Sequence, residues 1–394
     1  MHAQFVPSAI ISPVVSMPTD LPEFPSVSKA DWLRQVTKDL KGRALEDFDW
    51  SPAPGLAVTP FVHADDFAQS PAPLQSGPSR WEICEAVDAT DPAMANRQLL
   101  EALEYGAEGL ELYLPATVDA DHLGQTMNGV YLDLAGLHFT GPGVVRNPGA
   151  VLANLQKLAA RHQCSPAALH GSLAYDPVTQ ASLVDWRYLV DLVDFARAAF
   201  PGFRLVMIGT QDTLPNDPVE ELVRLLRQGN FYLQKLTERG LSVADVASIM
   251  QFSMITDKNY FLEIAKIRAF KILWLNVLQG WGAPLAYPDI AARFSPAAYT
   301  EDLYTNMIRA TTMAMSAVLG GADRLTVLPY DTGREGQATY SPTFSRRMAR
   351  NVQHLLKMES GLDEAADPAA GSYYLEKLTG QLSSAAWNRF VHGD

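Results

Sequence analysis

The chain has 394 residues, of which 47% are hydrophobic and 19% charged, and its mean hydropathy is close to zero. A net charge of −13 at pH 7 argues against a nucleic acid or an anionic membrane surface as its partner. The two cysteines, Cys84 and Cys164, are too few and too far apart for a disulfide framework or a structural zinc site, which favours a reducing, cytoplasmic location. No apolar run approaches the roughly 20 residues of a membrane-spanning helix, so we expect no membrane segment.

The first 80 residues are predicted to form an extended arm and a linker. Residues 1–27 are rich in Pro and Ser, and their apolar stretch lacks the basic flank and the cleavage site of a signal peptide. Apolar residues recur at helical spacing within 31–42, which predicts a short amphipathic helix. Residues 51–80 are again rich in Pro and Gly, as expected of a segment that wraps around a domain or links two elements.

From Trp81 onward, short apolar runs alternate with long helical patterns. Strands are predicted at 81–87, 109–114, 130–137, 168–175, 204–209, 251–255, a weak segment near 286–293, and 325–330. Helices are predicted near 92–106, 147–162, 184–199, 217–239, 258–279, 301–319, 342–359 and 374–390. This alternation favours one domain over 81–394 with a closed (β/α)8 TIM barrel, and a doubly wound open sheet is the alternative.

Few residues at the predicted strand ends indicate chemistry. Neither G-x-G-x-x-G after the first strand nor G-x-x-x-x-G-K-[ST] occurs, so no phosphate-binding loop is predicted. His170 lies within or before its strand, which favours a core histidine over a catalytic one. Asp212 and Asp257 precede helices, where N-capping is commoner than general-base catalysis. Gly320-Gly321 ends a helix, as expected of a C-cap.

Three stretches of the sequence are distinctive, namely NYFLEIAKIRAFKILW (259–274), AVLGGADRLTVLPYD (317–331) and residues 346–390, which contain the helix start DPAAGSYY (367–374). They closely resemble the barrel domain of cobalamin-dependent acyl-CoA mutases, with methylmalonyl-CoA mutase as the best match. Residues 26–66 also look like that family's N-terminal arm. The resemblance implies the barrel fold and, for the family's catalytic chains, adenosylcobalamin-dependent interconversion of methylmalonyl-CoA and succinyl-CoA in propionate metabolism.

The same resemblance implies that the substrate-binding positions of catalytic chains are replaced here. The replaced positions are Cys84 and Ala86 in the first strand, Ala174 and Tyr175 after the fourth, Thr210 after the fifth, and Pro288 and Ile290 near the seventh. Cys84 offers no cation for a substrate carboxylate, and Thr210 cannot act as an imidazole donor to the thioester oxygen. Of the run after the fourth strand only Asp176 is kept. We therefore expect no catalytic residue, bound cofactor or metal in this chain, and no histidine lies in the D-x-H-x-x-G pattern that ligates cobalamin cobalt.

This combination resembles the small (β), non-catalytic subunit of heterodimeric mutases. The resemblance implies pairing, through helices and the N-terminal arm (1–80), with a catalytic large subunit that carries adenosylcobalamin, and an isolated chain could form a homodimer. The chain ends soon after the barrel, so we expect no cobalamin-binding domain in it. Two alternatives stay open. One is a catalytic barrel with an altered acyl-CoA substrate and a separate cobalamin-binding chain, and the other is an acyl-CoA-binding or chaperone-like protein.

Overall fold

The computed structural model describes residues 27–69, 71–74, 79–180, 183–209, 217–334, 336 and 340–393. The chain divides into two compact units, residues 1–48 and 49–394. In the first unit, helix α1 (Lys29–Asp39) begins at a capping box, in which Ser28 and Asp31 each accept a hydrogen bond from the other's backbone amide. The short helix predicted in this region is therefore confirmed.

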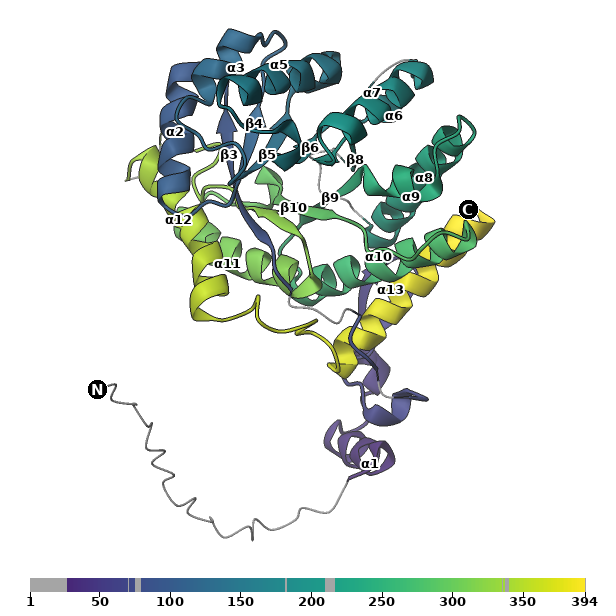
Figure 1. Cartoon of the computed structure of the whole chain (residues 1–394). Helices are drawn as coiled ribbons and strands as arrows, with labels where there is room; N and C mark the ends of the chain where they lie inside the picture. The colour runs from purple at the N-terminus through teal and green to yellow at the C-terminus, as the bar shows by residue number, and fades with distance from the viewer. Residues whose placement is uncertain are drawn as a thin grey trace, which may run out of the picture. The chain divides into compact units, whose positions relative to one another are not determined.

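The second unit is built on a parallel β-barrel (Figure 1). The strands are β3 (Glu82–Asp88), β4 (Gly109–Tyr113), β5 (Gly136–Thr140), β6 (His170–Leu173), β7 (Gly202–Arg204), β8 (Val206–Ile208), β9 (Met250–Thr256), β10 (Ile290–Phe294) and β11 (Arg324–Thr326). Their order in the sheet is β7-β6-β5-β4-β3-β11-β10-β9-β8.

The two ends of this sheet meet in one interrupted strand. Only Leu205 separates β7 from β8, and the Met207 amide donates to the Tyr175 carbonyl at 3.1 Å, which links β8 to the segment after β6. With β7 and β8 counted together, the nine strands of the sheet occupy eight positions around the ring. The (β/α)8 barrel expected from the sequence is therefore confirmed.

Helices cover the outside of the barrel (Figure 1). They are α2 (Pro92–Glu104), α3 (Ala120–Thr126), α4 (Pro142–Arg146), α5 (Pro148–Arg161), α6 (Pro177–Gln180), α7 (Trp186–Ala199), α8 (Pro218–Thr237), α9 (Val243–Ser248), α10 (Tyr260–Gly280), α11 (Leu303–Gly320), α12 (Pro342–His354) and α13 (Tyr373–His392). A hairpin of β1 (Trp50–Ala53) and β2 (Leu56–Val58) precedes the barrel. Across the described part of the chain, no helix has the length and apolar character needed to cross a bilayer.

The third barrel strand lies later in the chain than predicted. The pattern at 130–137 predicts a strand, but residues 131–134 form a turn in which the Leu134 amide donates to the carbonyl three residues earlier at 3.2 Å. Leu132 and Ala135 are buried from this turn. Because the apolar periodicity continues through the turn, it places the strand too early. The short helix α3 before the turn is also absent from the prediction.

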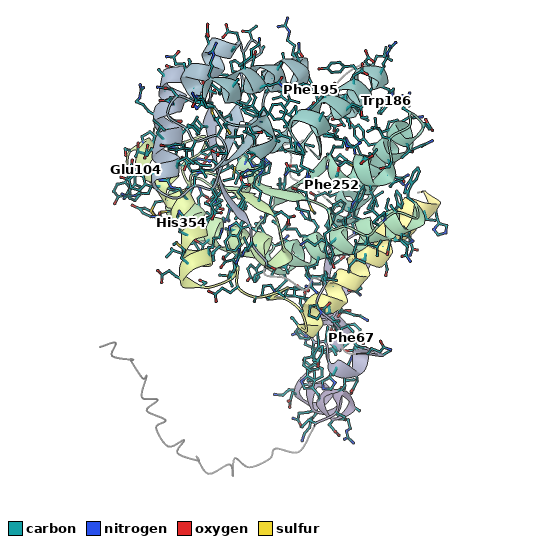
Figure 2. The ribbon with its side chains drawn as sticks, viewed as in Figure 1. Phe67, Glu104, Trp186, Phe195, Phe252 and His354 are labelled. Carbon is teal, nitrogen blue, oxygen red and sulfur yellow. The ribbon has the colours of Figure 1, made fainter. Side chains whose placement is uncertain are left out.

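Helix α10 packs deeply between the barrel and the outer helices. Phe252 of β9 is labelled in Figure 2. Its ring meets the rings of Phe270 and Trp274 edge-on, with centroids 4.7 and 4.8 Å apart. Gly229 of α8 lies against the same cluster, where a Cβ would come within 2.7 Å of the Trp274 ring. Aromatic packing of this kind fixes how α8 and α10 lie on the barrel.

Charged side chains are buried beside this apolar packing. Lys266 of α10 pairs with Glu263 and with Glu221 of α8, each at 2.8 Å, and all three side chains are almost fully buried. Burial raises the pKa of Glu263 to about 7, because one ammonium group faces two carboxylates and only partly offsets the loss of solvent. The pKa of Lys266 is raised, since the two carboxylates outweigh the effect of its burial.

The segment before α13 connects distant parts of the barrel unit. Asp367 is buried in a left-handed backbone conformation (φ 40°), and its carboxylate accepts from the Leu74 amide at 2.8 Å. Arg268 of α10 pairs with Asp367 and, at 2.8 Å, with Glu376 of α13. Because α13 begins at Tyr373, the DPAAGSYY stretch is a helix start, as predicted.

Residues 49–80 belong to the same compact unit as the barrel. The Ser79 amide donates to the Ala365 carbonyl at 3.1 Å, and the Gln381 side chain donates to the Ala57 carbonyl at 3.0 Å. The assignment of residues 1–80 to an arm that contacts another subunit stays a prediction.

Candidate functional site

Alternation along the strands decides which side chains enter the barrel lumen. In β3, Ile83 and Val87 pack in the core outside the barrel, so Glu82, Cys84 and Ala86 face the lumen. The strand register places further polar residues on this inner face, namely Glu111, His138, Ser172, Arg293, Arg324 and Thr326. The lumen is therefore polar at positions where (β/α)8 barrels commonly carry branched apolar residues.

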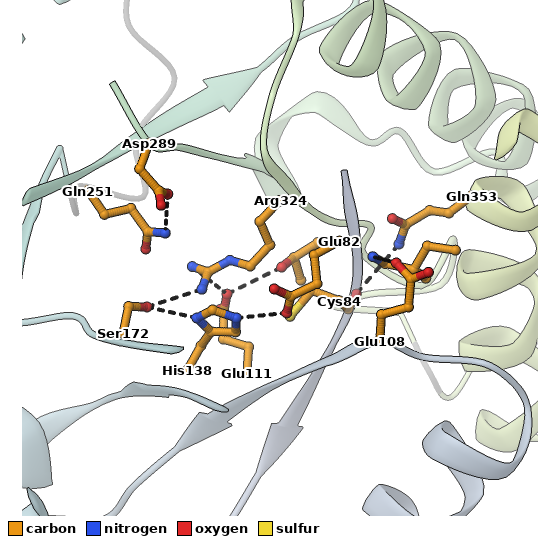
Figure 3. A network of polar contacts seen from close by, with 12 residues as sticks. Glu82, Cys84, Glu108, Glu111, His138, Ser172, Gln251, Asp289, Arg324 and Gln353 are labelled. Atoms are coloured by element: carbon orange, nitrogen blue, oxygen red, sulfur yellow. Dashed lines mark hydrogen bonds and ion pairs between the residues drawn. The ribbon is translucent and has the colours of Figure 1, made fainter. Parts of the chain in front are cut away.

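Four of these side chains form a chain of hydrogen bonds across the lumen (Figure 3). Arg324 Nη1 donates to Ser172 Oγ at 3.1 Å, and the same oxygen lies 2.8 Å from His138 Nδ1. His138 Nε2 lies 2.8 Å from Glu82 Oε1. A neutral imidazole protonated on Nε2 satisfies every link, since the Ser172 hydroxyl then donates to Nδ1 while Nε2 donates to Glu82.

Two glycines make room for the Glu82 carboxylate. A Cβ at Gly109 of β4 or at Gly136 of β5 would fall on the Glu82 carboxyl group. Since the two glycines lie opposite each other in the β4–β5 register, they form one small hollow in the barrel wall. The backbone itself is therefore shaped to accept this charged side chain.

Charges in this part of the lumen are balanced. Burial raises the pKa of Glu82, but the hydrogen bond from His138 and the charge of Arg324 bring that pKa below its ordinary value. Burial also raises the pKa of Glu111, and Arg293 and Arg324 reverse the shift. Burial and Arg324 lower the pKa of His138, so this ring is neutral at pH 7. Two carboxylates and two guanidiniums thus oppose each other in a site shielded from solvent.

Three lumen residues have the chemistry of metal ligands. A donor atom from each of Glu82, Cys84 and His138 lies within 4.8 Å of the others. However, Glu82 and His138 already bond to each other, and Arg324 places a positive charge beside them. Burial raises the pKa of the Cys84 thiol well above its ordinary value, which disfavours the thiolate. These features favour a hydrogen-bonded network over a cation site.

A cavity of about 600 Å³ opens at the C-terminal ends of β4, β5, β6 and β10, the end at which (β/α)8 enzymes bind their ligands. Its polar lining includes Tyr113, Thr140, Arg146, Gln180 and Arg293. Among the described residues that line it there is no histidine, lysine or carboxylate. The cavity therefore offers cations and hydrogen-bond donors but no side chain that titrates near neutral pH, so it is suited to binding rather than to proton transfer.

Four of the replaced positions lie in or beside the lumen. Cys84 is buried, Ala86 faces the lumen and is exposed, and Ala174 lines the cavity. Tyr175 lies where the barrel closes, and burial raises the pKa of its hydroxyl to about 12. None of these four side chains supplies a cation or an imidazole.

The other replaced positions do not line the cavity or lie outside the described residues. Thr210 is outside the described residues. Pro288 and Ile290 lie at the N-terminal end of β10, opposite the cavity, and Ile290 packs in the core. Arg293 is the residue of β10 that reaches the cavity, and the family resemblance does not single it out. Arg293 lies opposite Thr326 in the register of β10 and β11, and Thr326 faces the lumen. With the strand bounds known, this register would have identified Arg293 as a lumen residue.

Asp176, the residue kept from the run after the fourth strand, has a structural role. It is fully buried, and its carboxylate accepts from Tyr232 Oη at 2.5 Å and from Gln228, both on α8. Thr179 Oγ1 donates to the same carboxylate at 2.6 Å. These bonds direct the carboxylate to α8 rather than to the cavity.

The structure confirms the predicted role of Gly321 and corrects the predictions for His170 and Asp257. Gly321 adopts the left-handed conformation (φ 90°) that ends α11, so the predicted C-cap is confirmed. His170 is exposed at the start of β6, so its predicted core position is wrong. Asp257 does not cap α10, whose N-cap position is Asn259. Asp212 lies outside the described residues.

The fold and the site together define a (β/α)8 barrel. Polar side chains inside its lumen form hydrogen bonds and ion pairs with one another, below a cavity at the strand ends. A family model described as methylmalonyl-CoA mutase matches residues 124–392. The chain therefore belongs to the methylmalonyl-CoA mutase family.

Individual relatives agree with this assignment. The chain is similar to the methylmalonyl-CoA mutase small subunit of Porphyromonas gingivalis, with 30% identity over 94% of this chain and 63% of that protein. It is 31% identical to the small subunit of Streptomyces virginiae, over 93% of this chain and 64% of that protein. A methylmalonyl-CoA mutase of Cereibacter sphaeroides is 27% identical over 90% of this chain and 57% of that protein. The chain thus spans less than two thirds of the length of each of these relatives.

Proposed function

We propose that this chain is a small, non-catalytic subunit of a heterodimeric methylmalonyl-CoA mutase that acts in the cytoplasm in propionate metabolism. In this role it binds the catalytic large subunit and stabilises it. The relatives named as small subunits support the type of subunit. The replaced positions Cys84, Ala86 and Ala174 support the absence of catalysis, because they remove charged and hydrogen-bonding groups from the lumen side of the barrel.

The lumen network is the observation that carries the proposal. Rearrangement of an acyl-CoA needs a substrate inside the barrel, with donors aimed at its thioester oxygen. Here Arg324, Ser172, His138 and Glu82 bond to one another across the lumen below the strand-end cavity, and the described residues that line that cavity include no imidazole to donate to a thioester. Losing one of the hydrogen bonds that Arg324 or Glu82 makes in this network costs about 1.5–3 kcal/mol, since each is a bond to a charged group. The barrel is therefore better suited to a structural role than to turnover.

We place adenosylcobalamin on the partner subunit. Within the described part of this chain, the cavity at the strand ends offers Arg146 and Arg293 but no imidazole for cobalt. His138 is committed to Ser172 and Glu82 deeper in the barrel. None of these residues fits the role of a cobalt ligand.

Co-expression tests this function directly. This chain would be produced with a tagged catalytic large subunit of a methylmalonyl-CoA mutase, and an unrelated protein with the same tag would serve as the control. We expect this chain to co-purify in a one-to-one ratio with the large subunit only. We also expect methylmalonyl-CoA turnover with adenosylcobalamin by the pair and none by this chain alone.

Two results would contradict the proposal. Turnover by the isolated chain with adenosylcobalamin would show that it is catalytic. A large subunit that is stable and fully active alone, and does not retain this chain, would remove the stabilising role.

A further inference from the structure

The cavity at the strand ends has a charge opposite to that of the chain as a whole. The protein carries 44 acidic and 31 basic residues, a net charge of −13. Yet the described residues that line the cavity include two arginines, Arg146 and Arg293, and no carboxylate. Glu111, deeper in the barrel, balances the charge of Arg293, so the cavity gains its positive charge from Arg146, and this charge attracts an anion.

The two arginines stand on opposite walls of the barrel. Arg293 comes from β10, and Arg146 ends α4, which directly follows β5. In the closed ring β5 and β10 are four positions apart out of eight, so they face each other across the mouth. An anion held by both arginines therefore needs a negative group at each end.

The arginines also differ in depth. Arg293 is half-buried in the lumen face of its strand, whereas Arg146 is exposed at the rim. The buried Glu111 carboxylate lies deeper in the barrel and interacts electrostatically with Arg293. Because a guanidinium has five N–H donors in a rigid plane, it can hold this carboxylate and a ligand carboxylate at once. Tyr113, Thr140 and Gln180 add neutral donors to the lining of the cavity.

We propose that this cavity binds a small organic acid with two carboxylates, one held by Arg293 inside the mouth and the other by Arg146 at the rim. A volume of about 600 Å³ lies in the range of pockets for small molecules, about 300–1,000 Å³. The site binds without turnover, since its lining holds no group that titrates near neutral pH. This role goes beyond the proposed subunit function and does not depend on it, because the ligand is bound by this chain alone.

Calorimetric titration of the purified full-length chain at fixed ionic strength tests the site. Succinate supplies two carboxylates on a four-carbon chain, and butyrate is the matched acid with one. We expect succinate to bind more tightly than butyrate, and Arg146→Gln to abolish that difference, because the second carboxylate then has no cation to meet. A hydrogen bond to a charged group contributes about 1.5–3 kcal/mol, which corresponds to roughly tenfold or more in affinity when the bond is lost inside the mouth.

The different depths of Arg293 and Arg146 in the cavity predict which substitution weakens binding more. Arg293→Gln should abolish measurable binding of both acids, whereas Arg146→Gln should weaken succinate only severalfold, since solvent and salt screen the exposed rim. Arg293→Lys keeps the charge but not the planar fork, and should give an intermediate affinity. The control, Arg97→Gln on the exposed face of α2, should bind both acids as the wild type does.

Four outcomes would overturn the proposal. These are equal affinities for succinate and butyrate, an unchanged preference in Arg146→Gln, equal binding of sulfate and succinate, and binding of succinyl-CoA without binding of free succinate. If Arg293→Gln does not fold, the comparison of the two acids on Arg146→Gln still decides the matter. Subunit pairing is measured separately by co-purification, so either proposal can fail while the other stands.

Discussion

Replacing Arg268 with methionine should strongly destabilise the barrel unit. The Arg268 side chain is 1% exposed and bonds to Asp367 and to Glu376, whose side chains are 5% and 11% exposed. Methionine fills similar space without the charge, so the Asp367 carboxylate stays buried without its cation. Breaking a buried pair in this way costs about 3–5 kcal/mol of unfolding free energy. A loss of this size is a large part of the stability of a typical domain.

A double-mutant cycle separates the pair from general damage to the core. Asp367→Asn is a suitable second change because Asn tolerates the left-handed backbone at this position and still accepts from the Leu74 amide. We expect the double variant to be more stable than the sum of the single effects predicts, by at least about 1 kcal/mol. Chemical unfolding followed by circular dichroism gives the four free energies, and Arg97→Met on exposed α2 is the control.

The refuting results are specific. A loss below about 1 kcal/mol for Arg268→Met would place the change among ordinary surface substitutions. Additivity of the two changes within about 0.5 kcal/mol would show that the two side chains do not stabilise each other. Either result would contradict the view that this ion pair fixes the helix start at DPAAGSYY against α10.

Three further changes test other buried groups. Glu263→Gln should gain stability relative to the wild type as pH rises from about 4.5 to 7, by up to about 3 kcal/mol, because a carboxyl whose folded pKa is raised loses stability on ionising. Unfolding across this pH range measures the gain, and a pH-independent difference would contradict it. Gly109→Ala should lower the unfolding free energy by about 1–3 kcal/mol, since its methyl group would displace Glu82; an unchanged thermal midpoint would refute this. Asp176→Asn should cost about 1.5–3 kcal/mol through its charged bond to Tyr232, whereas a catalytic role would lower turnover of the assembled mutase at unchanged stability.

Local sequence patterns determined most of the secondary structure. Asp91 and Asp217, each followed by proline, cap α2 and α8 through side-chain bonds to backbone amides. Such caps involve residues two or three positions apart, so they can be recognised from the sequence alone. The strand predicted at 130–137 was misplaced because a turn with buried apolar residues has a similar local pattern.

Local patterns also gave the number and order of the barrel units. Alternation of short apolar runs with long helical periods implies parallel strands, and eight such units imply closure. The interruption at Leu205 between β7 and β8 does not alter this count, because the two segments occupy one position in the ring. The positions at which catalytic residues are expected to be replaced come from the family resemblance alone, and their assignment stays a prediction.

Only the tertiary structure decided how the polar residues are used. Arg324 and Ser172 are 152 positions apart, and Arg268 and Asp367 are 99 apart, so no local pattern links either pair. The sequence pattern of the strand that contains Arg293 is weak and does not indicate a role for this residue. Closure of the ring places its strand opposite the one that precedes Arg146. The physical reason is that burial and charge pairing depend on which strands become neighbours around the barrel, and that is fixed by the packing of the whole ring.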